Sequence, residues 1–190
     1  MTVDKHIALA NLAGKIINNH VGSALSAQAT QLVMGSGNVN SSVVIIGEAP
    51  GKQEDIQGLP FVGASGRFLN ELLESVGLTR DDVYITNIVK YRPPNNRDPT
   101  KQEKAEFWPY LLEQLHIIQP KVIVTLGRHS GMAFIPDLVI SEGHGTPRMV
   151  QLNKHSYTVL PLYHPAAALY NGKLRQTLLD DFSAVNELIT

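Results

Sequence analysis

The sequence predicts an α/β fold of three layers, in which helices cover both faces of a central, mostly parallel sheet. Three short apolar runs rich in β-branched residues, at 43–46, 83–85 and 122–126, are typical of buried strands. Helical patterns separate these runs, and such alternation favours parallel strands with helices on both sides. In folds of this class, functional sites lie at the carboxyl ends of the strands.

Further elements are expected around the first strands. Apolar residues at helical spacing predict a helix over 4–19 and a second, short helix over 23–32, followed by a glycine-rich connector at 35–38. An apolar stripe predicts another helix over 68–76. Gly77 is placed to end it, because glycine readily adopts the left-handed conformation of a helix stop.

The second half of the chain continues the alternation. Thr100 and Glu103 have the spacing of a capping box, which predicts the start of a helix. A strand pair is expected near 149–152 and 157–160, and the last helix over 174–188.

The composition is that of an ordinary globular protein, with 43% hydrophobic and 17% charged residues in a chain of 190. This length predicts a single domain, 1–190, made of an N-terminal helical segment, 1–34, and a core, 43–190. No apolar run is long enough to span a bilayer, and the N-terminus lacks the pattern of a signal peptide. We therefore expect a cytoplasmic protein without membrane contact, acting as a monomer.

The absence of cysteine excludes several classes of site, and the net charge bears on nucleic-acid binding. The chain has no cysteine, so disulfides, cysteine-ligated zinc and thiolate-held iron–sulfur clusters are excluded. The formal net charge is -1, which gives no sign of nucleic-acid binding. Any contact with DNA must therefore come from a local basic patch.

The first strand ends in a Gly-Glu-Ala-Pro-Gly run at 47–51, and Glu54 follows it. Two glycines and a proline predict a tight turn whose backbone amides face a ligand, with a carboxylate at each end. Taken alone, the same run is equally compatible with a surface turn that carries solvated acids.

Two further residues have both a functional and a structural interpretation. Phe61, held between Pro60 and glycines before a helix, is either a stacking platform for a base or a plug of the core. His164 stands beside Pro165, where an isolated histidine is usually a turn residue.

Asn87 ends the second strand, and its side chain offers both a donor and an acceptor, as reading the edge of a base requires. Alternatively, it caps the strand. The densest positive run of the chain follows, and we expect it to contact DNA phosphates unless it is only a solvated stretch. Its members are Lys90, Arg92, Arg97, Lys101 and Lys104.

In this order and spacing, the motifs resemble the uracil-DNA glycosylase superfamily, and most closely the branch called family 4. The resemblance extends from residue 43 to the C-terminus and is far more specific than any one motif. The segments that carry it are 47–51, 54–55, 60–63, 86–90, 92–97, 126–127 and 164–165.

The resemblance implies a catalytic role for the first motif. Gly47, Glu48 and Ala49 match the segment that binds the pyrimidine and places the attacking water. Glu54 matches an acidic position on which the family also relies, and we expect Glu48, ahead of Glu54, to activate the water. Neither motif contains a lysine, which favours a monofunctional enzyme over a Schiff-base lyase.

The other motifs match residues that hold the base and the DNA. Phe61 matches the aromatic ring that stacks on uracil, Asn87 the side chain that reads its edge, and His164 the donor to O2. The loop that enters the DNA where the base has left matches Pro165, Ala166 and Leu169.

Two departures from the family stand out. Family 4 holds an iron–sulfur cluster through four cysteines, whereas here Tyr91 and Glu106 occupy two of those positions and the N-terminal segment offers none. We expect no metal and no cofactor, and we expect packing by Tyr91, Trp108 and the N-terminal helix to replace the cluster. Ala166 stands where the family usually has serine, so one contact with the DNA backbone is lost.

The sequence therefore predicts a monofunctional glycosylase that hydrolyses the N-glycosidic bond of uracil in DNA and leaves an abasic site. One alternative is a preference for hypoxanthine, xanthine or mispaired thymine. Another is a uracil-DNA binder that traps the sugar covalently, for which His144 lies in a comparable region. A third is an enzyme that acts on a small molecule and does not bind DNA.

Overall fold

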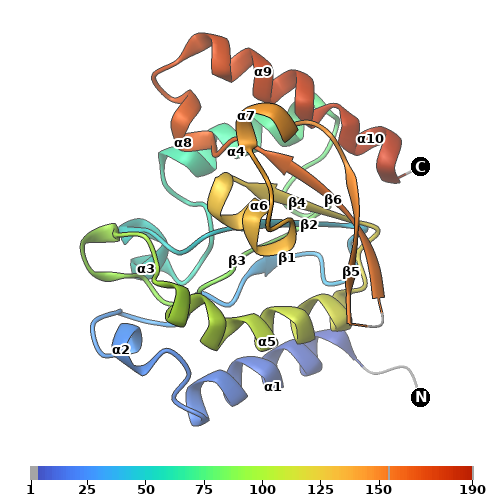
Figure 1. Ribbon diagram of the computed structural model, residues 1–190. Helices are drawn as coiled ribbons and strands as arrows, with labels where there is room; N and C mark the ends of the chain where they lie inside the picture. The colour runs from blue at the N-terminus through green and yellow to red at the C-terminus, as the bar shows by residue number, and fades with distance from the viewer. Residues whose placement is uncertain (1–3, 154, 190) are drawn as a thin grey trace.

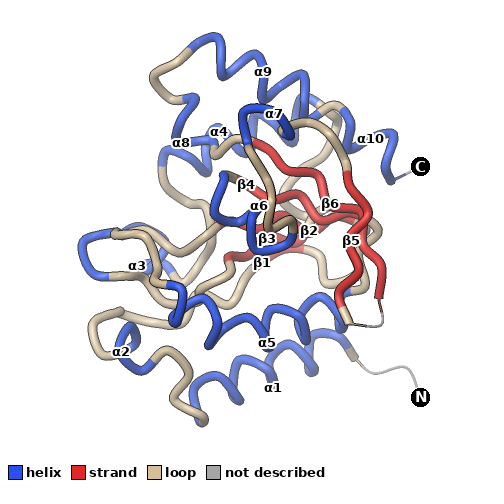
Figure 2. The backbone as a smooth tube through the Cα atoms, viewed as in Figure 1, coloured by secondary structure: helices blue, strands red, loops and turns tan. Residues whose placement is uncertain are grey.

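A computed structural model describes residues 4–153 and 155–189 and has a six-stranded sheet at its centre (Figures 1 and 2). The strand order is β1-β3-β2-β4-β6-β5. The four inner strands run parallel, and the two outer strands pair antiparallel with their neighbours. The strands are β1 (Ser36–Gly37), β2 (Val43–Gly47), β3 (Tyr84–Asn87), β4 (Val122–Leu126), β5 (Arg148–Leu152) and β6 (His155–Leu162).

Helices cover both faces of this sheet, which confirms the predicted three-layer α/β class (Figure 1). One layer contains α1 (Lys5–Asn18), α2 (Ser23–Ser26), α5 (Lys101–Ile118) and α6 (Arg128–Phe134). The other contains α4 (Ala64–Ser75), α8 (Pro165–Ala168), α9 (Gly172–Phe182) and α10 (Ala184–Ile189). The connections carry α3 (Lys52–Gln57), the 3-10 helix η1 (Pro94–Asn96) and α7 (Ile140–Gly143).

The inner strands are apolar throughout because both of their faces are buried. In β2, Val44 and Ile46 pack with the α1 and α5 layer, whereas Val43 and Ile45 pack with the α4 and α9 layer. Successive side chains of a strand point to opposite faces, so one short run supplies both cores.

Two predicted helix signals are confirmed. Gly77 adopts a φ of +76° directly after α4 and donates its N–H to the Glu74 carbonyl. At the start of α5, the Thr100 hydroxyl accepts from the Glu103 amide and the Glu103 carboxylate accepts from the Thr100 amide, which is the predicted capping box.

Three predicted elements are corrected. The helix expected over 23–32 ends at Ser26, because the Asp55 carboxylate holds the Thr30 amide and hydroxyl, both at 2.8 Å. The connector at 35–38 contains the edge strand β1. The last helix is two helices, which meet at Ser183.

The sequence motifs come together at the end of the sheet where the parallel strands have their carboxyl ends. Gly47 at the end of β2 is the register partner of Asn87 at the end of β3. Leu126 at the end of β4 pairs with Leu162 of β6, two residues before His164. The fold therefore brings the sequence motifs side by side at the carboxyl ends of parallel strands, as expected for this class. The single-domain assignment stays a prediction, and none of the described helices is long and apolar enough to cross a membrane.

Candidate active site

A cavity of about 540 Å³ opens at this edge of the sheet. Glu48 and Ala49 line it from the loop after β2, Gly127 from the end of β4, and His164 and Ala166 from the start of α8. Each of these segments follows a parallel strand, so the cavity lies where the fold class predicts a site.

Gly47, Asn87 and Phe61 converge beside the cavity. A Cβ atom added at Gly47 would lie 2.4 Å from Asn87 Oδ1 and 2.6 Å from Phe61 Cζ. Because neither distance leaves room for a methyl group, glycine is required for the amide and the ring to approach each other. The pair offers a polar edge next to an aromatic face, as a planar heterocycle requires.

The backbone of Phe61 is held in an unusual conformation. Its φ is +52°, a left-handed value that costs a non-glycine residue energy. The Arg80 guanidinium donates to the carbonyl of Phe61 at 3.0 Å and to that of Pro60 at 2.6 Å. Gly66 makes room for the same turn, since a Cβ there would overlap the Phe61 carbonyl. These contacts fix the ring, and Arg80 is a contributor that no motif reveals.

Glu54 anchors the other side of the same loop. Its Oε1 accepts from the amides of Val62 and Gly63, both at 2.9 Å. One oxygen of the Glu54 carboxylate is thus committed to two backbone donors and anchors this loop.

His164 lies with its ring stacked near Phe61, at 5.9 Å between ring centres and 28° between planes. Its Nδ1 accepts the Ala166 amide at 3.1 Å, so Nε2 carries the proton of the neutral ring. Burial lowers the pKa of His164 to about 4, and the nearby Glu54 only partly offsets that effect. His164 is therefore a neutral Nε2–H donor at physiological pH.

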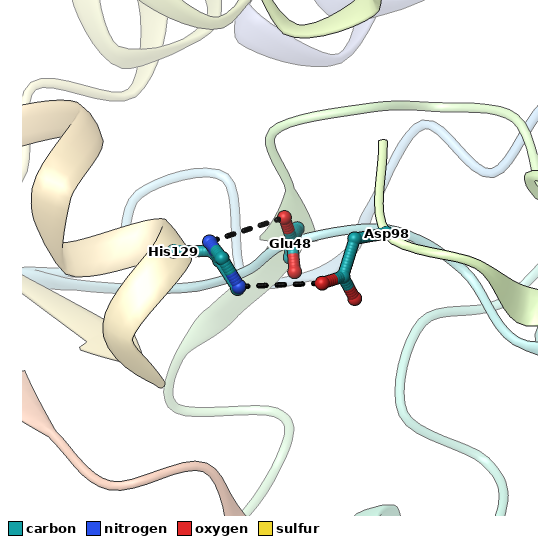
Figure 3. A group of neighbouring side chains, drawn as sticks. All are labelled: Glu48, Asp98 and His129. Atoms are coloured by element: carbon teal, nitrogen blue, oxygen red, sulfur yellow. Dashed lines mark ion pairs between the residues drawn. The ribbon is translucent and has the colours of Figure 1, made fainter. Parts of the chain in front are cut away.

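Glu48 is surrounded by charged groups that the sequence motif does not disclose (Figure 3). Its Oε1 lies 3.1 Å from Lys104 Nζ and 3.9 Å from His129 Nδ1. The other nitrogen of His129 lies 3.4 Å from Asp98 Oδ2, so the imidazole faces both carboxylates. Within the described residues, Glu48 Oε2 has neither a hydrogen bond nor an ion pair, which leaves it available to a ligand.

The same three side chains are of the kinds that can hold a metal ion. Glu48, Asp98 and His129 each offer one ligand atom, and these three atoms lie within 4.8 Å of one another. The Lys104 ammonium occupies the same Glu48 oxygen, and a cation placed there would be repelled. The arrangement favours an ion-pair network over a metal centre.

Lys90 was expected to contact DNA, and that prediction is wrong. The side chain is fully buried, and its ammonium donates to Thr86 Oγ1, the Asn87 carbonyl and Gln114 Oε1 at 2.6 to 2.7 Å. Burial lowers the pKa of Lys90 to about 7. Lys90 thus lies beneath the strand end and supports the backbone of Asn87.

The rest of the predicted basic stretch is partly neutralised within the protein. Arg97 forms a two-pronged pair with Glu103, at 2.6 and 2.8 Å, and this contact holds the pKa of Glu103 at about 2. Arg92 donates to Asn96 Oδ1. Lys101 is exposed and has no carboxylate partner in the part of the chain that the structure describes. The role of these residues toward DNA stays a prediction.

The segment that the sequence predicts to enter the DNA forms helix α8, which places Ala166 at the mouth of the cavity. Pro165 is buried, Ala166 is exposed and lines the cavity, and Leu169 is half-buried. The adjoining Tyr170 is 97% exposed, so it is the most prominent apolar group of this segment.

His144 is not brought to the described lining of the cavity. Its Nδ1 lies 2.6 Å from Asp181 Oδ2, and its ring packs against Tyr163 at 4.6 Å between centres. This placement gives no support to a covalent trap at His144.

The residues at the positions of the family's cluster cysteines cannot hold an iron–sulfur cluster. Tyr91 is buried with its ring edge-on to Phe107, and the Glu106 carboxylate accepts the Gly22 amide at 3.1 Å. No thiolate is available in a chain without cysteine. Tyr91 shares one core cluster with Leu9 and Ile16 of α1, and Trp108 packs against the same cluster at Phe134.

Comparisons with known proteins agree with this geometry. The sequence model described as "Uracil DNA glycosylase superfamily" matches residues 34–188. The type-4 uracil-DNA glycosylase of Archaeoglobus fulgidus is 47% identical over 165 residues, which cover 84% of this chain and 82% of that protein. A type-4 enzyme of Thermotoga maritima is 42% identical over 84% of each chain. The type-5 uracil-DNA glycosylase of Pyrobaculum aerophilum is 32% identical over 73% of this chain and 67% of its own. With a match over most of its length and its motifs gathered around one cavity, the chain belongs to the uracil-DNA glycosylase superfamily.

Proposed function

We propose that this protein hydrolyses the N-glycosidic bond of uracil in DNA, releasing free uracil and leaving an abasic site. The observation that carries the proposal is the close approach of Asn87 and Phe61 at Gly47, with the ring of His164 stacked near Phe61. They supply a polar edge, an aromatic face and a neutral donor, which are the groups that a uracil ring needs. Similarity to type-4 uracil-DNA glycosylases over most of the chain supports the same reaction.

The proposed pose places the extruded uracil on Phe61, with its O4 and N3–H facing the Asn87 amide and its O2 facing His164 Nε2. Base extrusion costs a few kcal/mol, and stacking recovers part of that cost. Cytosine presents the opposite donor and acceptor pattern at the same edge, which would leave buried polar groups unpaired. A site of this kind discriminates strongly against the wrong base.

The chemistry breaks the bond between uracil N1 and the sugar C1′, and the electron pair leaves with the base. His164 donates a hydrogen bond to O2 where negative charge develops, and no proton transfer is required. Water then adds at C1′ of the cationic sugar and loses a proton. Glu48, whose Oε2 is unpaired and whose Oε1 is held by Lys104, is the proposed acceptor of that proton.

The experiment that tests the function is a release assay on single- and double-stranded oligonucleotides. Uracil, hypoxanthine, xanthine and mispaired thymine are compared as substrates, and free base is measured directly. Release of uracil ahead of the other bases is expected, whereas preferential release of another base would select that alternative specificity. A denaturing gel that shows a stable protein–DNA adduct would replace the hydrolytic proposal with covalent trapping.

We further propose that the enzyme acts as a monomer in the cytoplasm without a metal or cofactor. The chain offers no thiolate, and the Lys104 ammonium opposes cation binding at Glu48. Excision that persists in a chelator, by protein that elutes at the monomer size, is the expected result.

A further inference from the structure

A second and larger hollow lies beside the catalytic cavity. This groove, of about 770 Å³, runs between α5 and α6. Trp108 and Ala105 line it from α5, and Met132 and Ala133 line it from α6. Met132 is 41% exposed, so the groove presents an apolar surface to solvent that the fold itself does not cover.

The groove and the catalytic cavity share a boundary. Arg128 and His129 line both hollows, and His129 also contacts Glu48. A DNA strand whose uracil occupies the cavity therefore continues along a path that can pass over this boundary and into the groove.

The charges of the groove suit a nucleic acid. Lys101 and Arg128 are exposed members of its lining, and neither pairs with a carboxylate in the described residues. No Asp or Glu is among the described residues that line it. Lys104 also lines the groove but is satisfied by Glu48, and Arg97, outside the described lining, is satisfied by Glu103. The two unpaired cations thus lie at the apolar groove, where phosphates would neutralise them.

Trp108 gives the groove a fixed aromatic wall. Its ring packs edge-on against the buried Phe134, with 5.1 Å between ring centres, and the residue is half-buried. An aromatic ring held in place next to unpaired cations is the combination with which proteins bind unpaired nucleotides.

Resting on the proposed function, we propose that this groove binds one nucleobase of the uracil-containing strand, adjacent to the extruded nucleotide. The base packs against Trp108 and Met132, and Lys101 and Arg128 contact the neighbouring phosphates. The site therefore recognises a flanking nucleotide through its flat face and its backbone, without reading its sequence.

The chain supplies its own reporter, because Trp108 is its only tryptophan. Tryptophan fluorescence is measured in a Glu48→Gln background, so that uracil-containing oligonucleotides bind with little turnover. The uracil is placed at the 5′ end, at the 3′ end or in the middle of otherwise identical single strands. Quenching is expected with the central uracil and with only one of the two end placements, which identifies the flank that enters the groove.

The matched variants are Met132→Glu and Met149→Glu, each made in the same Glu48→Gln background. Both methionines are exposed, and Met149 lies on β5, outside the described lining of the groove. Met132→Glu is expected to weaken binding of the central-uracil strand roughly 5- to 150-fold, the equivalent of losing one stacked base. Met132→Glu should not change binding of the strand whose terminal uracil leaves the Trp108 fluorescence unquenched. Met149→Glu should bind every substrate like the parent protein.

The results separate the two proposals. If uracil is released but no oligonucleotide quenches Trp108, or Met132→Glu binds like Met149→Glu, the groove is not a base subsite and the proposed function stands. Equal quenching by both end-placed uracils would also overturn the inference, because one groove serves one flank. If the unmodified protein releases no uracil from any strand, the proposed function itself fails.

Discussion

His164 Nδ1 accepts the backbone N–H of Ala166 at 3.1 Å, and this contact directs the ring proton to Nε2. Burial, which lowers the pKa of the ring to about 4, keeps that tautomer neutral. Its position two residues after β6, next to Phe61, suits a donor to the base in the proposed pose. The hydrogen bond from the Ala166 amide thus decides which ring nitrogen of His164 carries the proton and how the ring is oriented.

The first prediction concerns pH. The His164 ring should titrate near pH 4, far below the usual value of about 6.5, and NMR of ring-labelled histidine measures this directly. Because the folded pKa is depressed, the unfolded chain takes up the proton first as pH falls. The contribution of neutral His164 to stability is therefore complete above about pH 6.5 and is lost as pH falls toward 4. A titration near 6.5 would contradict the buried neutral donor.

The second prediction separates catalysis from folding at His164. His164→Ala should slow single-turnover excision about a hundred- to a thousand-fold, as expected for loss of one donor to a charge that develops in the transition state. Affinity for uracil-DNA should change little. Melting temperature and rate are measured on the same preparation, and a lower melting temperature with near-normal excision would make His164 a turn residue only.

Much of this arrangement was predictable from the sequence. The strand at 122–126 is predicted to the residue, and the motif at 47–51 follows β2 as expected, because buried parallel strands have a distinctive apolar pattern. Because sites of this class lie at the carboxyl ends of the strands, the sequence placed Gly47 and Asn87 at the same end of the sheet, whereas their register pairing is shown only by the structure.

The remainder depends on contacts between distant segments. Lys90 resembles a solvated cation in the sequence, but the bend that follows β3 turns its side chain inward to Gln114 of α5. Arg80 reaches back to the Pro60 and Phe61 carbonyls, and Arg128 joins the site as the first residue of α6, directly after Gly127. Charge patterns along a chain do not encode these distances.

The third prediction compares the two acidic candidates. Glu48→Gln should reduce excision about a hundred- to ten-thousand-fold, because an amide cannot accept the proton of the attacking water. Glu54→Gln should retain most activity, since the amide oxygen of glutamine still accepts the N–H groups of Val62 and Gly63. Single-turnover rates at saturating DNA measure both variants. The reverse order of losses would assign water activation to Glu54.

The fourth prediction tests the ion pair that holds Glu48. Lys104→Met should slow the chemical step about fivefold, the effect of a partly exposed ion pair worth about 1 kcal/mol. Lys104→Arg should restore most of the rate. Lys101→Met is the matched control, because it removes a cation from the same helix without touching Glu48, so it should weaken DNA binding and leave the saturated rate unchanged. Equal rate losses in Lys101→Met and Lys104→Met would show that only general DNA binding is involved.

The last prediction tests the close approach of Asn87 and Phe61. In Gly47→Ala, the added methyl group would lie 2.4 Å from Asn87 Oδ1 and 2.6 Å from Phe61 Cζ, so one of the two must move. A shift of about 1 Å at a positioned group can cost about a hundredfold in rate, and that loss of excision is expected. The affinity for DNA should stay near the parent value, because the expected contacts with DNA phosphates do not involve Gly47. Gly14→Ala in α1 is the matched control, since its added methyl group meets nothing within 4 Å and alanine favours the helix. That variant should keep full activity and melt at the same temperature or higher. If Gly47→Ala excises uracil as fast as Gly14→Ala, the base does not sit between Asn87 and Phe61, and the proposed pose is wrong.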